Sequence, residues 1–541
     1  MRDNKINVIP KPANVICRKD YFTITEKTKI ESDQKLLAVA EYFKKLISPA
    51  TGFDFGISEI KTGLTKSNII YLELNGELGN LGQEGYCLKV NPKRIILTAN
   101  KPVGIFYGIQ TIRQLLPIEI ERKEKTTNIE WAIPSIEIRD SPRFSWRGYM
   151  LDEGRHFLGK EVVKHLLDLL ALFKMNVFHW HLTEDQGWRI EIKKYPKLIE
   201  IGSKRTETQI GGFRSKKMDA APHEGFYTQE DIKEVISYAD KLFIKIIPEI
   251  DIPGHSKAAL AAYPEYSCTG GPFEVSTTFG IKKDVLCIGK ETTFEFLKNI
   301  LDEVVRLFPS DIIHIGGDEV PKKRWQKCPD CQGRIKREQL RNEKELHVYF
   351  TERVKKYLSS HGRRIMGWNQ ILSKKTTKEV IAQKWLFGKK LIKKHLMKGG
   401  NVVFSQFGYA YLDYSYQRTS LRKSYLYEPV PKKLPEEYHK NVLGIEAPMW
   451  TEWVRNVREL EWQTFPRLIA IAESNWTPQK KKDYKSFKNR LDFLLKRLDT
   501  FRVHFAKKKE YQPSFLKRAF GLLTMLKEPK RKSLYIKNNN R

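Results

Sequence analysis

The 541-residue chain has no long apolar run. No stretch approaches the ~20 uninterrupted apolar residues that a membrane-spanning helix needs. The N-terminal segment 1–12 also lacks the ~7–15-residue apolar core of a secretory signal. The sequence therefore predicts a protein without a membrane span, cytoplasmic unless a leader has been removed.

Cysteine is scarce, with six residues in the whole chain, which is too few for a disulfide scaffold. Cys328 and Cys331 form one CxxC pair, and neither a second pair nor a histidine is near them in the sequence. A structural zinc site is one interpretation of such a pair. We favour the other, a loop thiol pair or a local disulfide.

Acidic residues are outnumbered, 64 against 97 Lys and Arg, and the net charge is +33. Such an excess is typical of proteins that bind nucleic acids or anionic surfaces. Here the positive charge is scattered and rises mainly in residues 501–541, without the interleaved aromatics of a nucleic-acid site. We therefore expect no nucleic-acid partner, and a basic, solvated C-terminal extension at 501–541. One amphipathic helix face in it is predicted from Leu516, Phe520, Leu523 and Leu526.

Residues 1–141 are predicted to form a smaller α+β domain. Short β-branched runs bounded by turn residues predict strands at 68–74, 86–90 and 94–99. Apolar residues at helical spacing predict helices at 34–47 and 103–116. No constellation of catalytic residue types occurs in this domain, so we expect it to serve packing.

Residues 142–500 alternate between apolar strand segments and helical patterns. Helices are predicted at 160–174 and 293–308. The strand segments are nearly continuous apolar runs, typical of parallel strands buried on both faces; they are 144–152, 176–182, 242–250, 311–315, 363–368, 380–385, 401–405 and 441–449. Eight such units predict a catalytic (β/α)8 TIM barrel of α/β class. A doubly wound sheet is the alternative, and the absence of a glycine-rich phosphate loop after any strand weakens it.

Candidate functional residues recur where these strands end, which is where barrel enzymes place their chemistry. The acidic and basic candidates at the first four strand ends are Arg155, Asp185, His255, Asp318 and Glu319, and later ends supply Trp368, Trp385, Tyr411, Asp413 and Trp450. Carboxylates and arginine bind hydroxyls and indoles stack on sugar C–H faces, so the set indicates a sugar site. A metal is the main rival interpretation. Because HExxH and other His–carboxylate ligand spacings are missing, we expect no metal and no cofactor.

Asp318 and Glu319 are adjacent, which constrains the mechanism. A conventional retaining glycosidase needs two carboxyls ~5–5.5 Å apart across the scissile bond, and an inverting one ~6.5–9.5 Å. Neighbours at a strand end project in different directions. One is therefore expected to protonate the leaving oxygen while the other holds a substrate group that attacks. Gly316 and Gly317 are expected to let a ligand approach the backbone.

Several motifs, taken together and in order, resemble family 20 glycoside hydrolases, the β-N-acetylhexosaminidases. They are His314-Ile-Gly-Gly-Asp318-Glu319, His181-Leu-Thr-Glu-Asp-Gln-Gly-Trp-Arg189, Asp251-Ile-Pro-Gly-His255, Tyr411-Leu-Asp413 and the lead-in at 140–148. Residues 1–141 resemble the α+β domain that commonly precedes this family's barrel. The resemblance implies an exo-acting retaining enzyme that hydrolyses terminal β-linked GlcNAc or GalNAc, with a glycan or chitooligosaccharide as substrate.

The resemblance also implies a role for each site residue. Glu319 would be the general acid/base, and Asp318 would orient the substrate's 2-acetamido group, whose oxygen attacks to give an oxazolinium intermediate. Tyr411 would bind the acetamido oxygen. The sugar would be walled by Trp368, Trp385 and Trp450, and its hydroxyls held by Arg155, Asp413 and Glu452. Asp185 and His255 would either support the acid/base or have only a structural role.

Two local features accompany the resemblance. Asn369-Gln370 stand where many relatives carry acidic residues, a departure that leaves the core mechanism intact. Cys268 and Cys287 lie in the long loop after the third strand and could form a bridge in an oxidising compartment.

A non-catalytic glycan-binding barrel is the alternative function, and the intact proton donor Glu319 argues against it.

Overall fold

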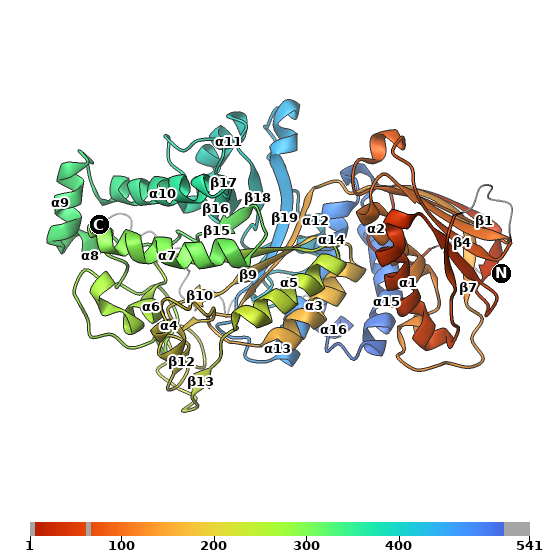
Figure 1. The fold of residues 1–541 in the computed structure, drawn as a ribbon, viewed down its shortest axis with the longest axis horizontal. Helices are drawn as coiled ribbons and strands as arrows, with labels where there is room; N and C mark the ends of the chain where they lie inside the picture. Colours follow the sequence, from red (N-terminus) through yellow and green to blue (C-terminus); the bar gives the residue numbers. More distant parts are fainter. Residues whose placement is uncertain (1–5, 61–66, 513–541) are drawn as a thin grey trace.

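The computed structural model describes residues 6–60 and 67–512, and it consists of an N-terminal sheet domain beside a closed barrel (Figure 1). The barrel strands are β8 (Trp146–Asp152), β9 (Val177–His181), β14 (Lys245–Glu249), β15 (Ile312–His314), β16 (Arg364–Trp368), β17 (Ile381–Lys384), β18 (Val402–Phe404) and β19 (Val442–Met449). All eight pair in parallel, and β19 closes the ring on β8. Each coincides with a predicted segment, which confirms the TIM barrel.

Amphipathic helices cover the barrel. The main ones are α3 (Lys160–Leu172), α5 (Gln229–Lys241), α7 (Glu291–Leu307), α10 (Glu343–Ser360), α11 (Lys389–Met397), α14 (Arg467–Trp476) and α15 (Tyr484–Thr500). In α3 the predicted apolar face, including Val163 and Leu167, is fully buried. At the start of α5 the Thr228 side chain and Asp231 form a reciprocal capping box.

Shorter elements lie in the loops between strands and helices. They are the hairpins β10 (Thr183–Glu184) with β11 (Gly187–Trp188) and β12 (Lys204–Arg205) with β13 (His223–Glu224), and the helices α4 (Lys197–Glu200), α6 (Lys257–Ala262), α8 (Lys323–Lys327), α9 (Pro329–Arg337), α12 (Leu421–Leu426), α13 (Val457–Thr464) and α16 (Lys508–Tyr511). The 3-10 turns η4 (Pro264–Tyr266) and η5 (Asn369–Ile371) also belong to these loops.

The N-terminal domain is a seven-stranded mixed sheet ordered β1-β7-β5-β6-β4-β2-β3. Its strands are β1 (Asn14–Thr23), β2 (Lys29–Ser32), β3 (Ile57–Glu59), β4 (Ile69–Leu74), β5 (Tyr86–Asn91), β6 (Arg94–Ala99) and β7 (Ala132–Asp140). Helices α1 (Leu37–Thr51) and α2 (Pro102–Leu115) pack against it, and η3 (Ile118–Glu121) follows α2. A Cβ on Gly108 would lie 2.2 Å from Leu97, so a glycine is needed where α2 touches β6. The α+β prediction is confirmed.

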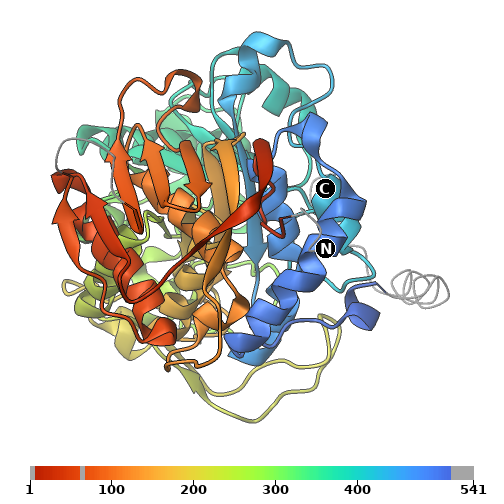
Figure 2. The ribbon, with the colours of Figure 1, turned by 90° about the vertical axis from the view of Figure 1, so that its right-hand side faces the viewer.

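Buried ion pairs join this domain to the barrel, which lies behind the sheet in Figure 2. Arg147 of β8 donates to Glu84, and Lys174 after α3 lies 3.5 Å from Asp140 at the end of β7. Lys174 also donates to the Tyr86 hydroxyl at 2.9 Å. Since charged groups are rarely buried without partners, these contacts favour one relative position of the two domains.

Residues 501–512, the start of the predicted C-terminal extension, pack on the barrel. Val503, Phe505 and Tyr511 are buried, and the Ala506 N–H donates to the Phe465 carbonyl at 3.1 Å. The helix face predicted between Leu516 and Leu526 lies outside the described residues. Among the helices of the described chain, none is long and apolar enough to cross a membrane.

Candidate active site

Glu319 lies just after β15, at the carboxyl end of the barrel, on a segment of unusual backbone. Gly316 and Gly317 have φ values of 61° and 85°, and Glu319 itself has φ 50°. A Cβ on Gly316 would lie 1.9 Å from Asp251 Oδ1, and one on Gly317 would lie 2.4 Å from Ile371 Cγ2. We expected these glycines to let a ligand approach the backbone. Instead, they make room for the side chains of Asp251 and Ile371. A non-glycine residue at positive φ is costly and is typical of functional sites.

Behind Glu319 stand the two predicted supporting residues. His255 Nε2 lies 3.9 Å from Glu319 Oε2, and His255 Nδ1 lies 3.4 Å from Asp185 Oδ2. Asp185 is held in turn by the Lys257 N–H at 3.0 Å. Burial alone would lower the pKa of His255, but the charge of Glu184 and hydrogen bonds to Asp185 and Glu184 raise that pKa well above its usual value. A charged imidazole therefore faces Glu319.

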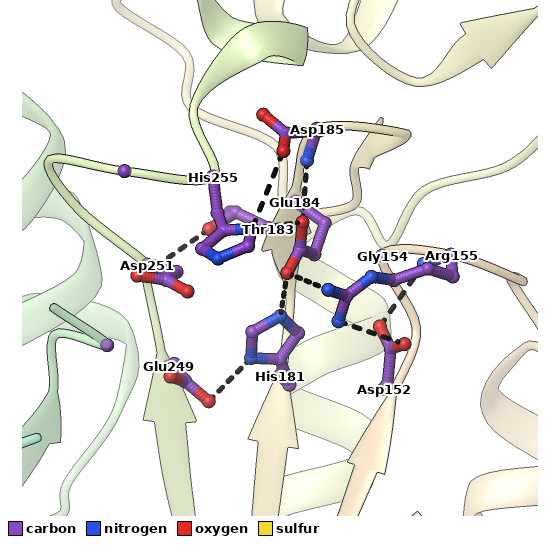
Figure 3. A network of polar contacts seen from close by, with 12 residues as sticks. Asp152, Gly154, Arg155, His181, Thr183, Glu184, Asp185, Glu249, Asp251 and His255 are labelled. Atoms are coloured by element: carbon purple, nitrogen blue, oxygen red, sulfur yellow. Dashed lines mark hydrogen bonds and ion pairs between the residues drawn. The ribbon is translucent and has the colours of Figure 1, made fainter. Parts of the chain in front are cut away.

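Glu184 is the centre of this network (Figure 3), and sequence reasoning missed its role. Its carboxylate lies 2.5 Å from Arg155 Nη2 and 3.0 Å from His255 Nδ1, and it accepts the Asp185 N–H at 2.9 Å. Burial would raise its pKa, but Arg155 and His255 hold the pKa of Glu184 well below its usual value. An ionised Glu184 thus fixes a predicted substrate-binding arginine and the histidine behind the acid/base. Its position beside Asp185 in the quoted motif was the available signal.

Asp318 is 8% exposed, and its Oδ1 has no hydrogen-bond partner within the described part of the chain. Burial raises the pKa of Asp318 to about 7; His255 opposes that shift, and the charge of Glu319 adds to it. Asp251, His255 and Asp318 bring their polar atoms within 4.8 Å of one another. An unpartnered buried carboxylate oxygen is suited to accept a hydrogen bond from a bound molecule.

The predicted aromatic residues form one cluster around Met150, made of Trp368, Trp385, Tyr411 and Trp450. The Trp368 and Trp450 rings are 5.5 Å apart, and the Trp385 and Tyr411 rings stack at 6.2 Å. Trp385 donates its indole N–H to Gln370 Oε1 at 2.8 Å and its backbone N–H to Asn369 Oδ1 at 3.1 Å. The two amides that depart from the family pattern therefore orient a wall of the cluster.

The remaining predicted binding residues lie beside this cluster. The Arg155 guanidinium is 4.8 Å from the Trp450 ring centroid and 3.3 Å from Asp152 Oδ2. Glu452 is buried in the loop after β19, and its charge acts on Arg155. Asp413 follows Tyr411 in the loop after β18, which Arg467 holds by donating to the Leu412 carbonyl at 2.6 Å. The predicted substrate-binding residues thus come from five strand ends, those of β8, β16, β17, β18 and β19.

A second charged network lies one layer deeper, and the sequence did not predict it. The Glu249 carboxylate lies 2.9 Å from His179 Nε2, 2.9 Å from His314 Nδ1 and 2.5 Å from His181 Nδ1, and it accepts the Trp368 indole N–H at 2.9 Å. His179, Glu249 and His314 also lie close enough to be a metal ligand set. However, both ring nitrogens of His179 meet carboxylates, since Nδ1 is 2.8 Å from Glu446. These carboxylates outweigh burial and raise the pKa of His179 to about 9.

Comparison with known proteins identifies the family of the chain. Residues 144–479 match the family model "Glycosyl hydrolase family 20, catalytic domain", and residues 5–141 match "Glycosyl hydrolase family 20, domain 2". The chain belongs to glycosyl hydrolase family 20. The predicted family and the predicted class of enzyme, a glycoside hydrolase, are confirmed.

Named relatives are similar over nearly the whole chain. A β-hexosaminidase of Porphyromonas gingivalis is 39% identical over 518 residues, which is 93% of this chain and 64% of that protein. The chain thus spans about two thirds of that relative's length. Streptomyces plicatus N-acetyl-β-hexosaminidase, solved in complex with thio-NAglucal, superposes with a TM-score of 0.80 at 32% identity, over 93% of this chain and 96% of that one. The exo-β-N-acetylglucosaminidase of Vibrio harveyi, solved in complex with N-acetylglucosamine, gives 0.81 at 31%, covering 93% and 78%.

Proposed function

We propose that this protein is an exo-acting, retaining β-N-acetylhexosaminidase that hydrolyses terminal β-linked GlcNAc or GalNAc by substrate-assisted catalysis. Its family membership and the names of its relatives support the hydrolysis of N-acetylhexosaminides. The mechanism is our inference from the arrangement of Asp318 and Glu319.

The observation that carries the proposal is the Asp318 oxygen beside Glu319, which has no hydrogen-bond partner among residues 6–60 and 67–512. Other buried carboxylates near Glu319 are engaged by the protein, Glu184 by Arg155 and Asp251 by the Gly317 N–H at 3.0 Å. Asp318 can therefore accept the N–H of a substrate amide. An acetamido group held in this way has its carbonyl oxygen free to attack the neighbouring anomeric carbon.

The reaction then needs only one proton donor from the enzyme. Glu319 protonates the glycosidic oxygen while the acetamido oxygen attacks, and the sugar–oxygen bond breaks to leave an oxazolinium ion. Asp318 stabilises the positive charge that develops on the acetamido nitrogen. Glu319, now a carboxylate, removes a proton from water, which opens the oxazolinium with retention at the anomeric carbon.

The surrounding residues suit a terminal sugar. Trp368, Trp385 and Trp450 offer flat apolar faces for pyranose C–H groups. Tyr411, which stacks against Trp385, is assigned the hydrogen bond to the acetamido oxygen. Arg155, Asp413 and Glu452 supply charged groups for ring hydroxyls.

A matched pair of substrates tests the proposal. We expect turnover of an aryl β-N-acetylglucosaminide and none of the corresponding aryl β-glucoside, because only the first carries the nucleophile. Glu319→Gln should abolish most of this turnover, while the control Glu77→Gln, at an exposed position of the N-terminal domain, should leave it unchanged. Equal turnover of both sugars would contradict substrate assistance, and no turnover of either would favour a glycan-binding barrel.

A graded series makes the test sharper. Replacing the N-acetyl group by mono-, di- and trifluoroacetyl lowers the nucleophilicity of the amide oxygen stepwise with little change in size. Substrate assistance predicts that kcat falls at each step. A constant kcat along the series would place the nucleophile on the enzyme instead.

A further inference from the structure

Four of the six cysteines meet at one point outside the active site. Cys268 and Cys287 lie in the loop between β14 and α7, and Cys328 and Cys331 lie at the start of α9, in the segment after β15. All four sulfur atoms lie within 4.8 Å of one another. The second pair that the CxxC lacks in sequence is therefore supplied by a different loop.

The sulfur positions have the spacing of a metal-bound set. The Sγ–Sγ distances are 3.8 Å for Cys268–Cys331, 3.6 Å for Cys287–Cys328 and 3.7 Å for Cys287–Cys331. A disulfide bond is about 2.05 Å long, and all six cysteines are free in the structure. Four sulfurs arranged tetrahedrally at about 2.3 Å from a zinc ion lie about 3.8 Å apart. The observed spacing thus favours a shared metal over the disulfide that Cys268 and Cys287 could form in an oxidising compartment.

Three of the four cysteines are shielded from solvent. Cys287, Cys328 and Cys331 are buried, so little water competes with a metal ion for their sulfurs. Cys328 is the N-cap of α9 and Cys331 lies in its first turn, with Pro329 leading the helix. The two CxxC cysteines are therefore presented together by the first turn of one helix.

The two loops approach closely at this point. A Cβ on Gly289 would lie 2.2 Å from the Asp330 carbonyl carbon and 2.3 Å from the Cys331 nitrogen, so the backbone after Cys287 rests directly on the CxxC turn. Arg334 donates to the Gly289 carbonyl at 3.2 Å, and Lys290 donates to the Ser267 carbonyl at 3.1 Å. Both contacts tie the loop that carries Cys268 and Cys287 in place beside the CxxC turn.

We propose that Cys268, Cys287, Cys328 and Cys331 bind one zinc ion as a structural site. Four thiolates fill a tetrahedral coordination sphere and leave no position for water or substrate, so this ion takes no part in the hydrolysis. The proposal replaces our expectation from the sequence that the protein binds no metal.

The site joins the two loops that carry the catalytic machinery. Cys268 follows His255 by thirteen residues, and Cys328 follows Glu319 by nine. Between β14 and α7 the chain forms only the short α6 and η4. Clamping this long loop to α9 reduces its conformational freedom and fixes His255 relative to Glu319. In Figure 1 α8 and α9 lie at the end of the molecule farthest from the N-terminal domain.

Metal content tests the proposal directly. Full-length protein, expressed with zinc in the medium and purified without a histidine tag, should hold one zinc per chain by elemental mass spectrometry. Cys287→Ser and Cys328→Ser should each lose it. Cys17→Ser and Cys87→Ser are matched controls, because these cysteines lie on β1 and β5 of the N-terminal sheet, and both should keep the zinc.

The wild-type protein gives a second readout that does not depend on variants folding. Replacing zinc by Co²⁺ should produce the red d–d bands and near-ultraviolet charge-transfer band of a tetrahedral tetrathiolate. Removal of the metal with a thiol-reactive mercurial, reversed by dithiothreitol, should lower Tm by several degrees and reduce kcat, and zinc should restore both.

Three results would overturn the proposal. One is wild-type protein without zinc whose four cysteines titrate as free thiols. Another is an intact mass lower by the four hydrogens that two disulfides release, with no bound metal. The third is stoichiometric iron in place of zinc. Activity plays no part in these outcomes, so they are independent of the proposed glycosidase function.

Discussion

Asp318 and Glu319 are neighbours on the chain, but their surroundings prepare them for different tasks. The Glu319 side chain is 20% exposed and faces the charged imidazole of His255. This exposure lets Glu319 exchange protons with substrate and water. Asp318 is buried, and one of its oxygens has no hydrogen-bond partner among the residues that the structure describes. A buried carboxylate responds strongly to charge that develops beside it, because little water screens the interaction.

Asp318→Asn is expected to lower kcat by about 10²–10³, the range lost when a preorganised stabiliser of transition-state charge is removed. The amide keeps the shape of the side chain but has no charge to offset that of the oxazolinium. KM for the aryl β-N-acetylglucosaminide should change much less. Steady-state kinetics, with the surface variant Asp492→Asn as control, measures the effect. An unchanged kcat would contradict the role given to Asp318.

His255 is expected to be a positioning residue that acts through Glu319. His255→Asn should reduce kcat for a substrate with a poor leaving group, as part of the ~10²–10⁴-fold that general acid catalysis contributes. It should have little effect on a dinitrophenyl glycoside, whose leaving oxygen needs no proton. Glu319→Gln should show the same dependence on the leaving group, and His361→Asn, at the exposed end of α10, should show none. Equal losses for both substrates would mean that His255 only stabilises the fold.

At the scale of elements, the short turn after β15 determines where the two carboxylates lie. Three residues in left-handed backbone conformations, Gly316, Gly317 and Glu319, reverse the chain between strand and loop. Asp251 fills the space beside Gly316 and accepts the Gly317 N–H. The turn is therefore built against the neighbouring strand end as much as by its own sequence.

Comparing Gly316→Ala with Gly362→Ala should separate the cost of backbone strain at positive φ from the cost of displacing Asp251. Both glycines have positive φ, 61° and 68°, but a Cβ at Gly362 meets no atom within 4 Å. The Gly362 variant should lose only the backbone strain, about 1 kcal/mol of unfolding free energy. The Gly316 variant should lose at least about 1–3 kcal/mol more, because Asp251 must move. Chemical denaturation measures both values, and kcat should fall only for Gly316→Ala. Equal losses would show that the contact with Asp251 is unimportant.

Across the whole molecule, features that depend on residues close together in the sequence could be predicted, and features that depend on residues far apart could not. The barrel strands were predictable because a strand buried on both faces is nearly continuous in apolar residues, as in 176–182 around β9. The catalytic residues were predictable because they sit at strand ends within short motifs. Asp185 and Glu184 are adjacent in one motif, and only the fold shows that Glu184 binds both Arg155 and His255.

Features that depend on long-range contacts were not predictable in this way. The His179–Glu249–His314 network joins three strands, and each residue alone is unremarkable in sequence. The four cysteines come from two loops whose approach is determined by tertiary packing. Burial of Val503 and Phe505 likewise depends on the helices they contact, while the composition around them indicates solvent exposure.

The excess positive charge also has a structural use at the domain interface. Glu121 in η3 lies between Arg113 of α2, at 2.7 Å, and Arg497 of α15, and its side chain is 2% exposed. Burial would raise the pKa of Glu121, but these two arginines lower it, so it stays ionised. One carboxylate thus pairs with two buried cations that belong to different parts of the molecule.

Glu121→Gln should therefore destabilise the protein by about 3–5 kcal/mol, the cost of leaving buried charges without a partner. The amide retains the volume, so the loss reflects charge rather than packing. Activity at low temperature should remain normal, because Glu121 belongs to the N-terminal domain and the catalytic groups belong to the barrel. Glu137→Gln removes an exposed pair with Arg18 and should cost less than about 1 kcal/mol. Equilibrium denaturation of the two variants compares these losses, and if they were equal the interface charges would contribute no more than a surface pair.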